Sequence, residues 1–176
     1  MNEFLRTDTA MSALSSMRTG GIAPVAYFPE TEQSLCDTVR RLTEEHKRFF
    51  VFGNLSNVLL PDGTLDFVPV ITTGIKTVTV TDTDDGIKVY AACGVSLTGL
   101  ALEFCRRDYA GLSFAYGIPG TVGGAVFMNA GAYGSEMKTS CVRCAFTTSM
   151  PIQSAKFRLP TAALGIAQAF SPIKTA

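Results

Sequence analysis

The chain has 176 residues, 47% of them hydrophobic and 17% charged. This is enough apolar material for one ordinary domain or two small lobes, and it argues against global disorder. The 15 basic and 15 acidic residues give a formal net charge of zero, which argues against a strongly basic nucleic-acid surface.

The cysteines and the first residues bear on the cellular compartment. Five cysteines, an odd number at irregular spacing, do not make a disulfide framework. Met1-Asn-Glu-Phe-Leu-Arg6 contains no cationic segment followed by an apolar run, and no stretch is long and apolar enough to span a bilayer. We therefore expect a cytoplasmic protein with reduced thiols and no membrane insertion.

A turn and a helix come first in the chain. The adjacent Gly20 and Gly21 predict a turn or a close approach of two backbones. Residues 31–47 predict an amphipathic helix with Ser34 as a candidate N-cap. The apolar stripe of this helix consists of Leu35, Val39 and Leu42, and His46 stands among charged residues as a solvated surface residue would.

Short strands and a second helix follow. Residues 49–52 and 67–72 each predict a strand, and residues 77–81 and 86–91 flank an acidic turn, which predicts a β-hairpin. Residues 97–107 predict a helix whose buried face holds Leu97, Leu100, Ala101, Phe104 and Cys105. Strands mixed with helices indicate an α+β or α/β fold.

Two segments are candidate ligand sites. In the first loop, Gly53-Asn-Leu-Ser-Asn57, polar residues follow directly on an apolar strand, which is a favoured ligand position in open α/β folds. The glycine-rich segment, Gly117-Ile-Pro-Gly-Thr-Val-Gly-Gly124, would let backbone N–H groups approach a bulky anion. Each segment alone also fits a tight turn that binds nothing, but two on one chain favour a dinucleotide.

Residues that follow the glycine-rich segment extend the candidate site. Residues 125–130 predict a short helix whose positive N-terminus, with the Thr121 hydroxyl, would face a pyrophosphate. The small-residue segment, Asn129-Ala-Gly-Ala-Tyr-Gly134, suits packing against a flat ring. Cys141-Val-Arg-Cys144 is a lone cysteine pair, for which strand residues are a better interpretation than a metal or redox site. We expect no metal.

The residues then match a known family. Gly117-Ile-Pro-Gly-Thr-Val-Gly-Gly-Ala-Val-Phe-Met-Asn-Ala-Gly-Ala-Tyr-Gly-Ser-Glu-Met137 resembles the signature of the UDP-N-acetylenolpyruvoylglucosamine reductase (UDP-N-acetylmuramate dehydrogenase) family. Phe52-Gly-Asn-Leu-Ser-Asn-Val-Leu-Leu60 resembles its Gly-x-Gly-Ser-Asn-x-Leu loop. Further segments fit in the same order, namely residues 16–23, 92–97 and 111–115, so that the resemblance covers roughly residues 11–145.

The resemblance implies a fold and an activity. The fold would be an FAD-binding domain of the vanillyl-alcohol-oxidase / p-cresol-methylhydroxylase type with two small α/β lobes, residues 1–75 and 76–145. A separate C-terminal substrate domain would be absent. FAD would take hydride from NADPH and pass it to a nucleotide sugar, UDP-N-acetylglucosamine enolpyruvate, which gives UDP-N-acetylmuramate for peptidoglycan synthesis. The intact family would be monomeric.

Site residues are carried over from the family by position. The resemblance implies that the first loop holds the FAD pyrophosphate and that the other two segments line the rest of the flavin site. The cofactor-binding residues would be Gly53, Asn54, Leu55, Ser56, Asn57, Gly117, Ile118, Pro119, Gly120, Thr121, Gly123, Gly124, Asn129, Ala130, Gly131, Ala132, Tyr133 and Gly134. No catalytic residue is carried over, because the family's arginine, serine and glutamate are absent.

Two departures from the family pattern stand out. Leu55 replaces the second glycine of the first loop, where a side chain would crowd the phosphate or force a different backbone angle. The family's Tyr-Arg-x-Ser-x-Phe motif is missing, and Leu164-Gly-Ile-Ala-Gln-Ala-Phe-Ser171 stands in its place. The codons of that segment, read two bases later, permit Gly-Tyr-Arg-Thr-Ser-Val-Phe.

The composition changes near the missing motif. All 15 acidic residues lie in residues 3–136, and residues 137–176 contain none. We therefore expect a frameshift near residues 145–150, with residues 146–176 an out-of-frame tail and the chain inactive alone. The alternatives are a non-catalytic flavin-binding remnant, or another FAD oxidoreductase of the same fold.

Overall fold

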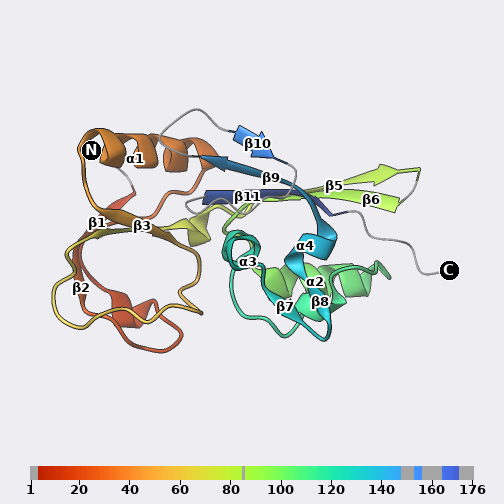
Figure 1. Ribbon diagram of the computed structural model, residues 1–176, viewed down its shortest axis with the longest axis horizontal. Helices are drawn as coiled ribbons and strands as arrows, with labels where there is room; N and C mark the ends of the chain where they lie inside the picture. Colours follow the sequence, from red (N-terminus) through yellow and green to blue (C-terminus); the bar gives the residue numbers. More distant parts are fainter. Residues whose placement is uncertain (1–3, 85, 148–152, 156–163, 171–176) are drawn as a thin grey trace. The chain divides into compact units, whose positions relative to one another are not determined.

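The computed structural model describes residues 4–84, 86–147, 153–155 and 164–170, with backbone alone beyond Cys141. It separates into two compact units, Met1–Ile75 and Lys76–Ala176. Each unit has its own sheet and helices (Figure 1). This mixture of strands and helices confirms the predicted α+β class.

The first unit is built on a four-stranded sheet in the order β1-β2-β4-β3. β1 and β2 are antiparallel, whereas β4 runs parallel to both β2 and β3. The strands are β1 (Leu5–Ala10), β2 (Ile22–Tyr27), β3 (Phe49–Phe52) and β4 (Val68–Ile71). Short 3-10 turns η1 (Met11–Ala13) and η2 (Thr72–Gly74) follow β1 and β4.

Helix α1 (Glu32–Glu44) is the predicted amphipathic helix, and its apolar stripe is buried as expected. Its cap differs from the prediction. Thr31 is the N-cap and Ser34 is its partner three residues on, with each side chain accepting a hydrogen bond from the other's backbone N–H at 3.1 Å. The helix ends before residue 47 because His46, which is exposed, has a left-handed backbone with φ 51°.

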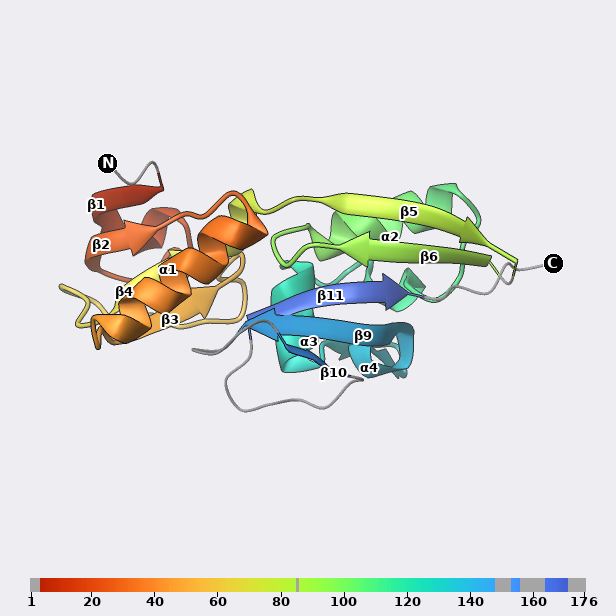
Figure 2. The same cartoon turned by 90° about the horizontal axis from the view of Figure 1, so that it is seen from above.

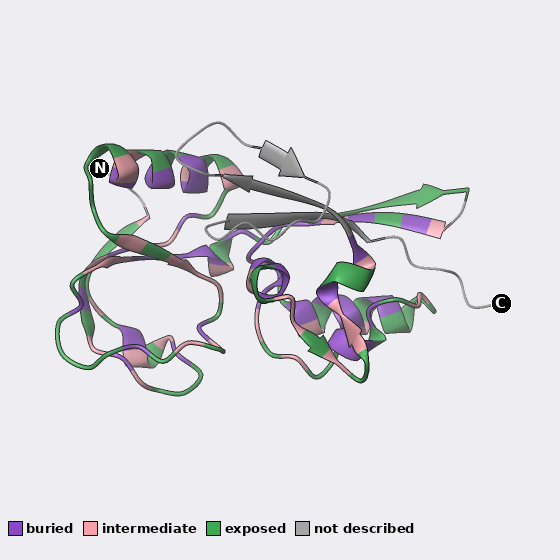
Figure 3. Ribbon diagram, viewed as in Figure 1, coloured by how far each residue is buried: buried purple, intermediate pink, exposed green. Residues whose placement is uncertain are grey.

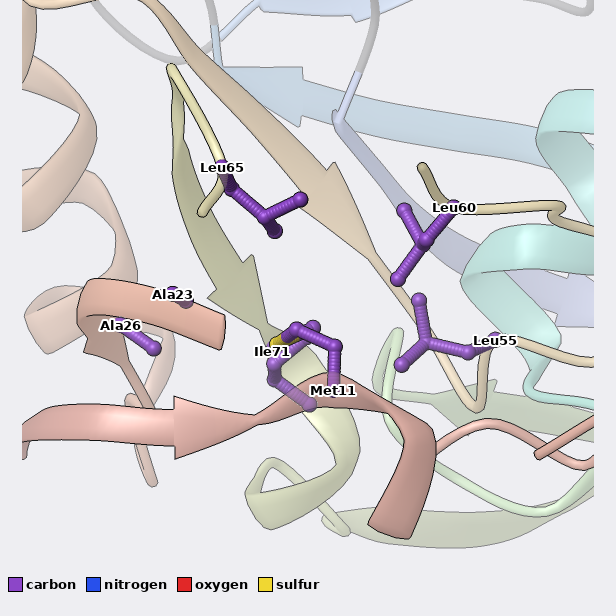
Figure 4. Close-up of a cluster of buried hydrophobic side chains, with 7 residues drawn as sticks. All are labelled: Met11, Ala23, Ala26, Leu55, Leu60, Leu65 and Ile71. Carbon is purple, nitrogen blue, oxygen red and sulfur yellow. The ribbon is translucent and has the colours of Figure 1, made fainter. Parts of the chain in front are cut away.

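Loop residues supply much of the core of the first unit. Figure 4 shows the cluster, which consists of Met11, Ala23, Ala26, Leu55, Leu60, Leu65 and Ile71. Leu55, Leu60 and Leu65 lie between β3 and β4, outside any strand. Burial of each leucine side chain contributes about 1.5–3 kcal/mol to the stability of the fold. Three such side chains therefore anchor the long connection between β3 and β4 in the core.

The paired glycines adjoin this connection. Gly20 has a left-handed backbone with φ 113°, and Gly21 lies so close to Gly63 that an added Cβ would stand 1.7 Å from the Gly63 carbonyl oxygen. Hydrogen bonds join the two segments, from the Gly21 N–H to the Pro61 carbonyl at 2.9 Å and from the Ile22 N–H to the Gly63 carbonyl at 2.7 Å. The predicted close approach of two backbones is confirmed.

The second unit contains a five-stranded antiparallel sheet in the order β10-β9-β11-β6-β5. Figure 1 and Figure 2 show its helices together on one face of this sheet. The strands are β5 (Val78–Thr83), β6 (Gly86–Ala91), β9 (Cys141–Thr147), β10 (Gln153–Ala155) and β11 (Leu164–Phe170), with a small β7–β8 ribbon (Gly131–Ala132 and Ser135–Glu136). The helices are α2 (Leu97–Arg106), α3 (Val122–Met128) and α4 (Met137–Ser140), with the 3-10 turn η3 (Ser113–Ala115).

Burial in the second unit follows the predicted patterns with one exception. In β6 every second residue is buried and the residues between them are half-buried or exposed, as expected for a strand with one covered face (Figure 3). Four of the five residues predicted on the buried face of α2 are buried, but Cys105 is exposed. The helix ends at Arg106, and Phe104 is its last buried residue.

The predicted hairpin and the predicted strand at the cysteine pair are both found, whereas the predicted out-of-frame tail contains strands that the sequence does not predict. β5 pairs with β6 but extends through Asp82 and Thr83, which shortens the turn. Residues 141–144 form the start of β9, so their interpretation as strand residues is confirmed. Much of the predicted out-of-frame tail, residues 146–176, lies outside the described residues. Within it the backbone forms β10 and β11, where the sequence predicts no element.

Candidate functional site

The first loop follows β3 in the first unit, as predicted. Asn54 and Asn57 are exposed and Ser56 is half-buried, so polar side chains occupy the outer side of the loop. In the described part of the chain, the backbone N–H groups of Asn54, Leu55 and Asn57 meet no acceptor. The loop therefore presents hydrogen-bond donors without a basic side chain.

Leu55 does not crowd the outer side of the loop. Its side chain is 3% exposed and packs inward with Met11, Leu60 and Ile71 (Figure 4). Its backbone is left-handed, with φ 52°. The side chain is therefore directed away from the outer side of the loop, and the backbone keeps an angle that a glycine would adopt without strain.

The glycine-rich segment leads into α3 in the second unit. The helix begins at Val122, earlier than the predicted residue 125, because the Thr121 side chain caps it by accepting from the Gly124 N–H at 3.3 Å. Thr121 is buried and forms an isolated antiparallel bridge with Ser96, which itself caps α2. The N-cap residues of α2 and α3 are thus paired by this bridge.

The first N–H groups of α3 are already bonded within the protein. The Val122 N–H donates to the Val95 carbonyl at 2.8 Å, and the Gly123 N–H donates to the Cys93 carbonyl at 2.9 Å. These two groups hold α3 against residues 93–95 and are not free to bind the pyrophosphate that is expected at this helix N-terminus. Any anion has to use other donors.

The glycines of this segment fall into two classes. At Gly123 an added Cβ would stand 2.6 Å from the Cys93 Cβ, so this glycine is needed for packing. At Gly117 an added Cβ would meet no protein atom within 4 Å, and the backbone there needs no left-handed angle. Within the described residues, the N–H groups of Gly117, Gly120 and Thr121 have no acceptor, and they are the donors left for a ligand.

The small-residue segment is closed by side-chain hydrogen bonds. Asn129 ends α3 with a left-handed backbone, φ 47°. Its amide donates from Nδ2 to Glu136 Oε2 at 2.5 Å, and its Oδ1 accepts from the Lys138 N–H at 3.0 Å. Tyr133, at the tip between β7 and β8, is 92% exposed. Both polar atoms of the Asn129 side-chain amide are therefore bonded within the protein, whereas the side chain of Tyr133 is accessible to a ligand.

The pKa of Glu136, which bonds to Asn129 in this segment, is lowered. Its bond and ion pair with Lys138, followed by the hydrogen bond from Asn129, hold the pKa of the Glu136 carboxyl below its ordinary value of 4.5. The ionised form is therefore favoured in the folded state. Neither Glu136 nor Lys138 is a predicted site residue, since their role depends on the fold of the β7–β8 ribbon.

Replacing Glu136 by glutamine is expected to weaken the acid dependence of stability. Because the folded pKa is lowered, this contribution is complete above pH 4.5 and is lost as the pH falls through the folded pKa. Urea denaturation between pH 7 and pH 3 should show a shallower loss for Glu136→Gln than for the unaltered chain. Lys138→Gln should reproduce part of the change, and identical pH profiles would contradict the assignment.

The part of the chain that is described contains neither a metal-binding cluster nor a membrane-spanning helix. No three His, Cys, Asp or Glu side chains gather there as a metal site would require. None of its helices has the length and apolar character needed to cross a bilayer.

Comparisons with known proteins give a family and a fold. The model of the FAD binding domain family matches residues 23–149. The UDP-N-acetylenolpyruvoylglucosamine reductase of Caldicellulosiruptor bescii is 38% identical over 136 residues, which are 77% of this chain and 42% of that protein. The reductase of Limosilactobacillus reuteri is 38% identical over 142 residues, 78% of this chain and 46% of that protein. The chain thus spans less than half the length of these curated relatives.

Solved structures show the same fold at low identity. The UDP-N-acetylenolpyruvylglucosamine reductase of Thermus caldophilus superposes with a TM-score of 0.70 at 24% identity, covering 96% of this chain and 62% of that one. A cholesterol oxidase of Brevibacterium sterolicum gives a TM-score of 0.73 at 12% identity, covering 99% and 38%. With the family match, these structures confirm the predicted FAD-binding fold.

Proposed function

We propose that this chain, which belongs to the FAD binding domain family and is 38% identical to UDP-N-acetylenolpyruvoylglucosamine reductases, forms the FAD-binding part of such a reductase. The glycine-rich segment carries the proposal. It keeps three N–H groups without an acceptor in the described chain, beside a glycine whose Cβ position is empty. This is the arrangement that close approach of a cofactor requires.

The proposal assigns separate tasks to the segments. The first loop would hold pyrophosphate oxygens through its amide and N–H donors. Gly117, Gly120 and Thr121 would bind FAD through their backbones, and the small-residue segment would contact it through Tyr133 and its neighbours. These residues fit an uncharged, donor-rich contact with the cofactor. When bound, FAD would supply hydride transfer.

The reaction itself is proposed for the family's full-length form. NADPH would be the hydride donor and UDP-N-acetylglucosamine enolpyruvate, a nucleotide sugar, the acceptor. We propose that the protein acts in the cytoplasm as a monomer, without nucleic acid. The residues of this chain would bind and orient the cofactor, and we assign none of them a catalytic role.

A second candidate is a flavin-binding protein without reductase activity. The observation that favours it is the sequence of residues 164–171, Leu-Gly-Ile-Ala-Gln-Ala-Phe-Ser, which contains no arginine where the family carries a catalytic one. In this case the two lobes would still bind FAD.

The test is flavin binding followed by turnover. Purified protein should be yellow, or should gain flavin absorbance and quench FAD fluorescence on titration. The reason is that the N–H groups without an acceptor would donate hydrogen bonds to the cofactor. A colourless preparation that binds no added FAD would refute both candidates. Oxidation of NADPH that depends on the enolpyruvyl substrate would establish the reductase and refute the second candidate.

A further inference from the structure

Leu55 stands at the centre of the first loop, and we propose that it is a positioning residue for FAD binding. Its buried side chain fixes the loop so that the neighbouring donors face the pyrophosphate. The inference rests on the proposed function and adds a residue whose side chain touches no cofactor.

The side chain of Leu55 anchors the loop in the core of the first unit. It is 3% exposed and packs in the cluster that contains Met11, Leu60 and Ile71 (Figure 4). Asn54 and Asn57, on either side of it, are exposed. Leu55 is thus the one fully buried residue of a loop that is otherwise open, and the anchor restricts the conformations that the donors can sample.

The backbone of Leu55 shows that the anchor decides the geometry. A left-handed φ of 52° is disfavoured for leucine, because its Cβ crowds the backbone. Such an angle persists where surrounding structure over-determines it, and here the burial of the side chain does so. The same angle turns the chain sharply, so that an inward side chain is compatible with outward polar neighbours.

The groups that this arrangement displays suit an anion with several oxygens. The N–H groups of Asn54, Leu55 and Asn57 meet no acceptor in the described chain. The loop contains no acidic side chain that would repel phosphate. Successive N–H groups at a turn that includes a left-handed residue are a known means of binding phosphate without a cation. Correct placement of these donors therefore governs affinity.

The experiment compares substitutions within one core cluster. Leu65 lies in the same cluster, is 5% exposed, and stands outside the loop, so Leu65→Ala is the matched control. FAD dissociation constants are measured by flavin fluorescence at a temperature where circular dichroism shows each variant folded. Leu55→Ala should weaken FAD binding at least tenfold and lower Tm, whereas Leu65→Ala should lower Tm similarly and leave the dissociation constant within about twofold.

Two further variants separate the side chain from the backbone. Leu55→Met keeps a long apolar side chain and should retain affinity within about threefold. Leu55→Gly restores the glycine of the family's loop and permits the left-handed angle, but it removes the anchor. It should bind FAD more weakly than the unaltered chain, because the core cluster here contains the leucine side chain. A Leu55→Gly or Leu55→Ala variant that binds FAD as tightly as the unaltered chain would overturn the positioning role alone. An unaltered chain that binds no FAD would instead overturn the proposed function.

Discussion

Replacing Gly21 by alanine is expected to lower the free energy of unfolding of the first unit by about 3 kcal/mol or more, above the usual range for overpacking. The added Cβ would stand 1.7 Å from the Gly63 carbonyl oxygen and 2.6 Å from the Gly63 backbone nitrogen. Both neighbours are backbone atoms, so no side-chain rotation can relieve the contact. Urea denaturation followed by circular dichroism would measure the loss.

The loss of structure in Gly21→Ala should be confined to the two segments that pack together at Gly21, β2 and residues 61–63. Moving the Gly63 segment away would break the hydrogen bonds that the Gly21 and Ile22 N–H groups make with residues 61 and 63. Hydrogen exchange should therefore quicken at β2. Gly99→Ala is the control, because its Cβ would meet only Ser96 at 3.4 Å within an exposed turn of α2, and it should be neutral or slightly stabilising. A Gly21→Ala protein as stable as the unaltered chain would contradict the close approach.

Replacing Gly117 by alanine is expected to weaken FAD binding at least tenfold, about 1.4 kcal/mol in binding free energy, and to leave stability within about 0.5 kcal/mol. No protein atom lies within 4 Å of the new Cβ, so the fold has no reason to change. The Cβ would instead occupy space beside the free N–H groups that the cofactor needs. Flavin titration and urea denaturation measure the two effects.

Gly123→Ala should show the reverse order of effects. Its Cβ would stand 2.6 Å from the Cys93 Cβ, which should cost about 1–3 kcal/mol of stability through overpacking. Any loss of FAD affinity would then follow from displacement of α3. A Gly117→Ala variant that binds FAD normally would remove this segment's backbone from the proposed site, whatever Gly123→Ala does.

Local patterns predicted most of the elements and some of their ends. The stripe of α1 and the alternation in β6 are short-range features, and both are found in the structure. The sequence predicts the cap of α1 at Ser34, since a serine near the helix start is a common cap. The structure uses Thr31 as the cap and Ser34 as its partner, a distinction that depends on backbone angles which composition does not reveal.

Long-range packing explains what could not be predicted at the candidate site. Four glycines in the segment look alike in the sequence, but Gly123 is constrained by Cys93 and Gly117 by no protein atom. Likewise, the N–H groups at the start of α3 donate to the carbonyls of residues 93 and 95. No local sequence pattern predicts this bonding. At Leu55, the loop motif predicts a glycine, and only the core cluster shows where the leucine side chain goes.

The position of β11 has a consequence for biosynthesis. This strand pairs with β6 on one side and β9 on the other, so the middle of the five-stranded sheet comes from residues 164–170. As the ribosome adds residues in order, the β5–β6 hairpin emerges early and waits with one edge unpaired until β11 arrives. Pairing between segments so far apart in the chain is slow, and an open strand edge in the meantime invites association with other chains. Nascent chains of this protein are therefore expected to need chaperone protection for the second unit more than for the first.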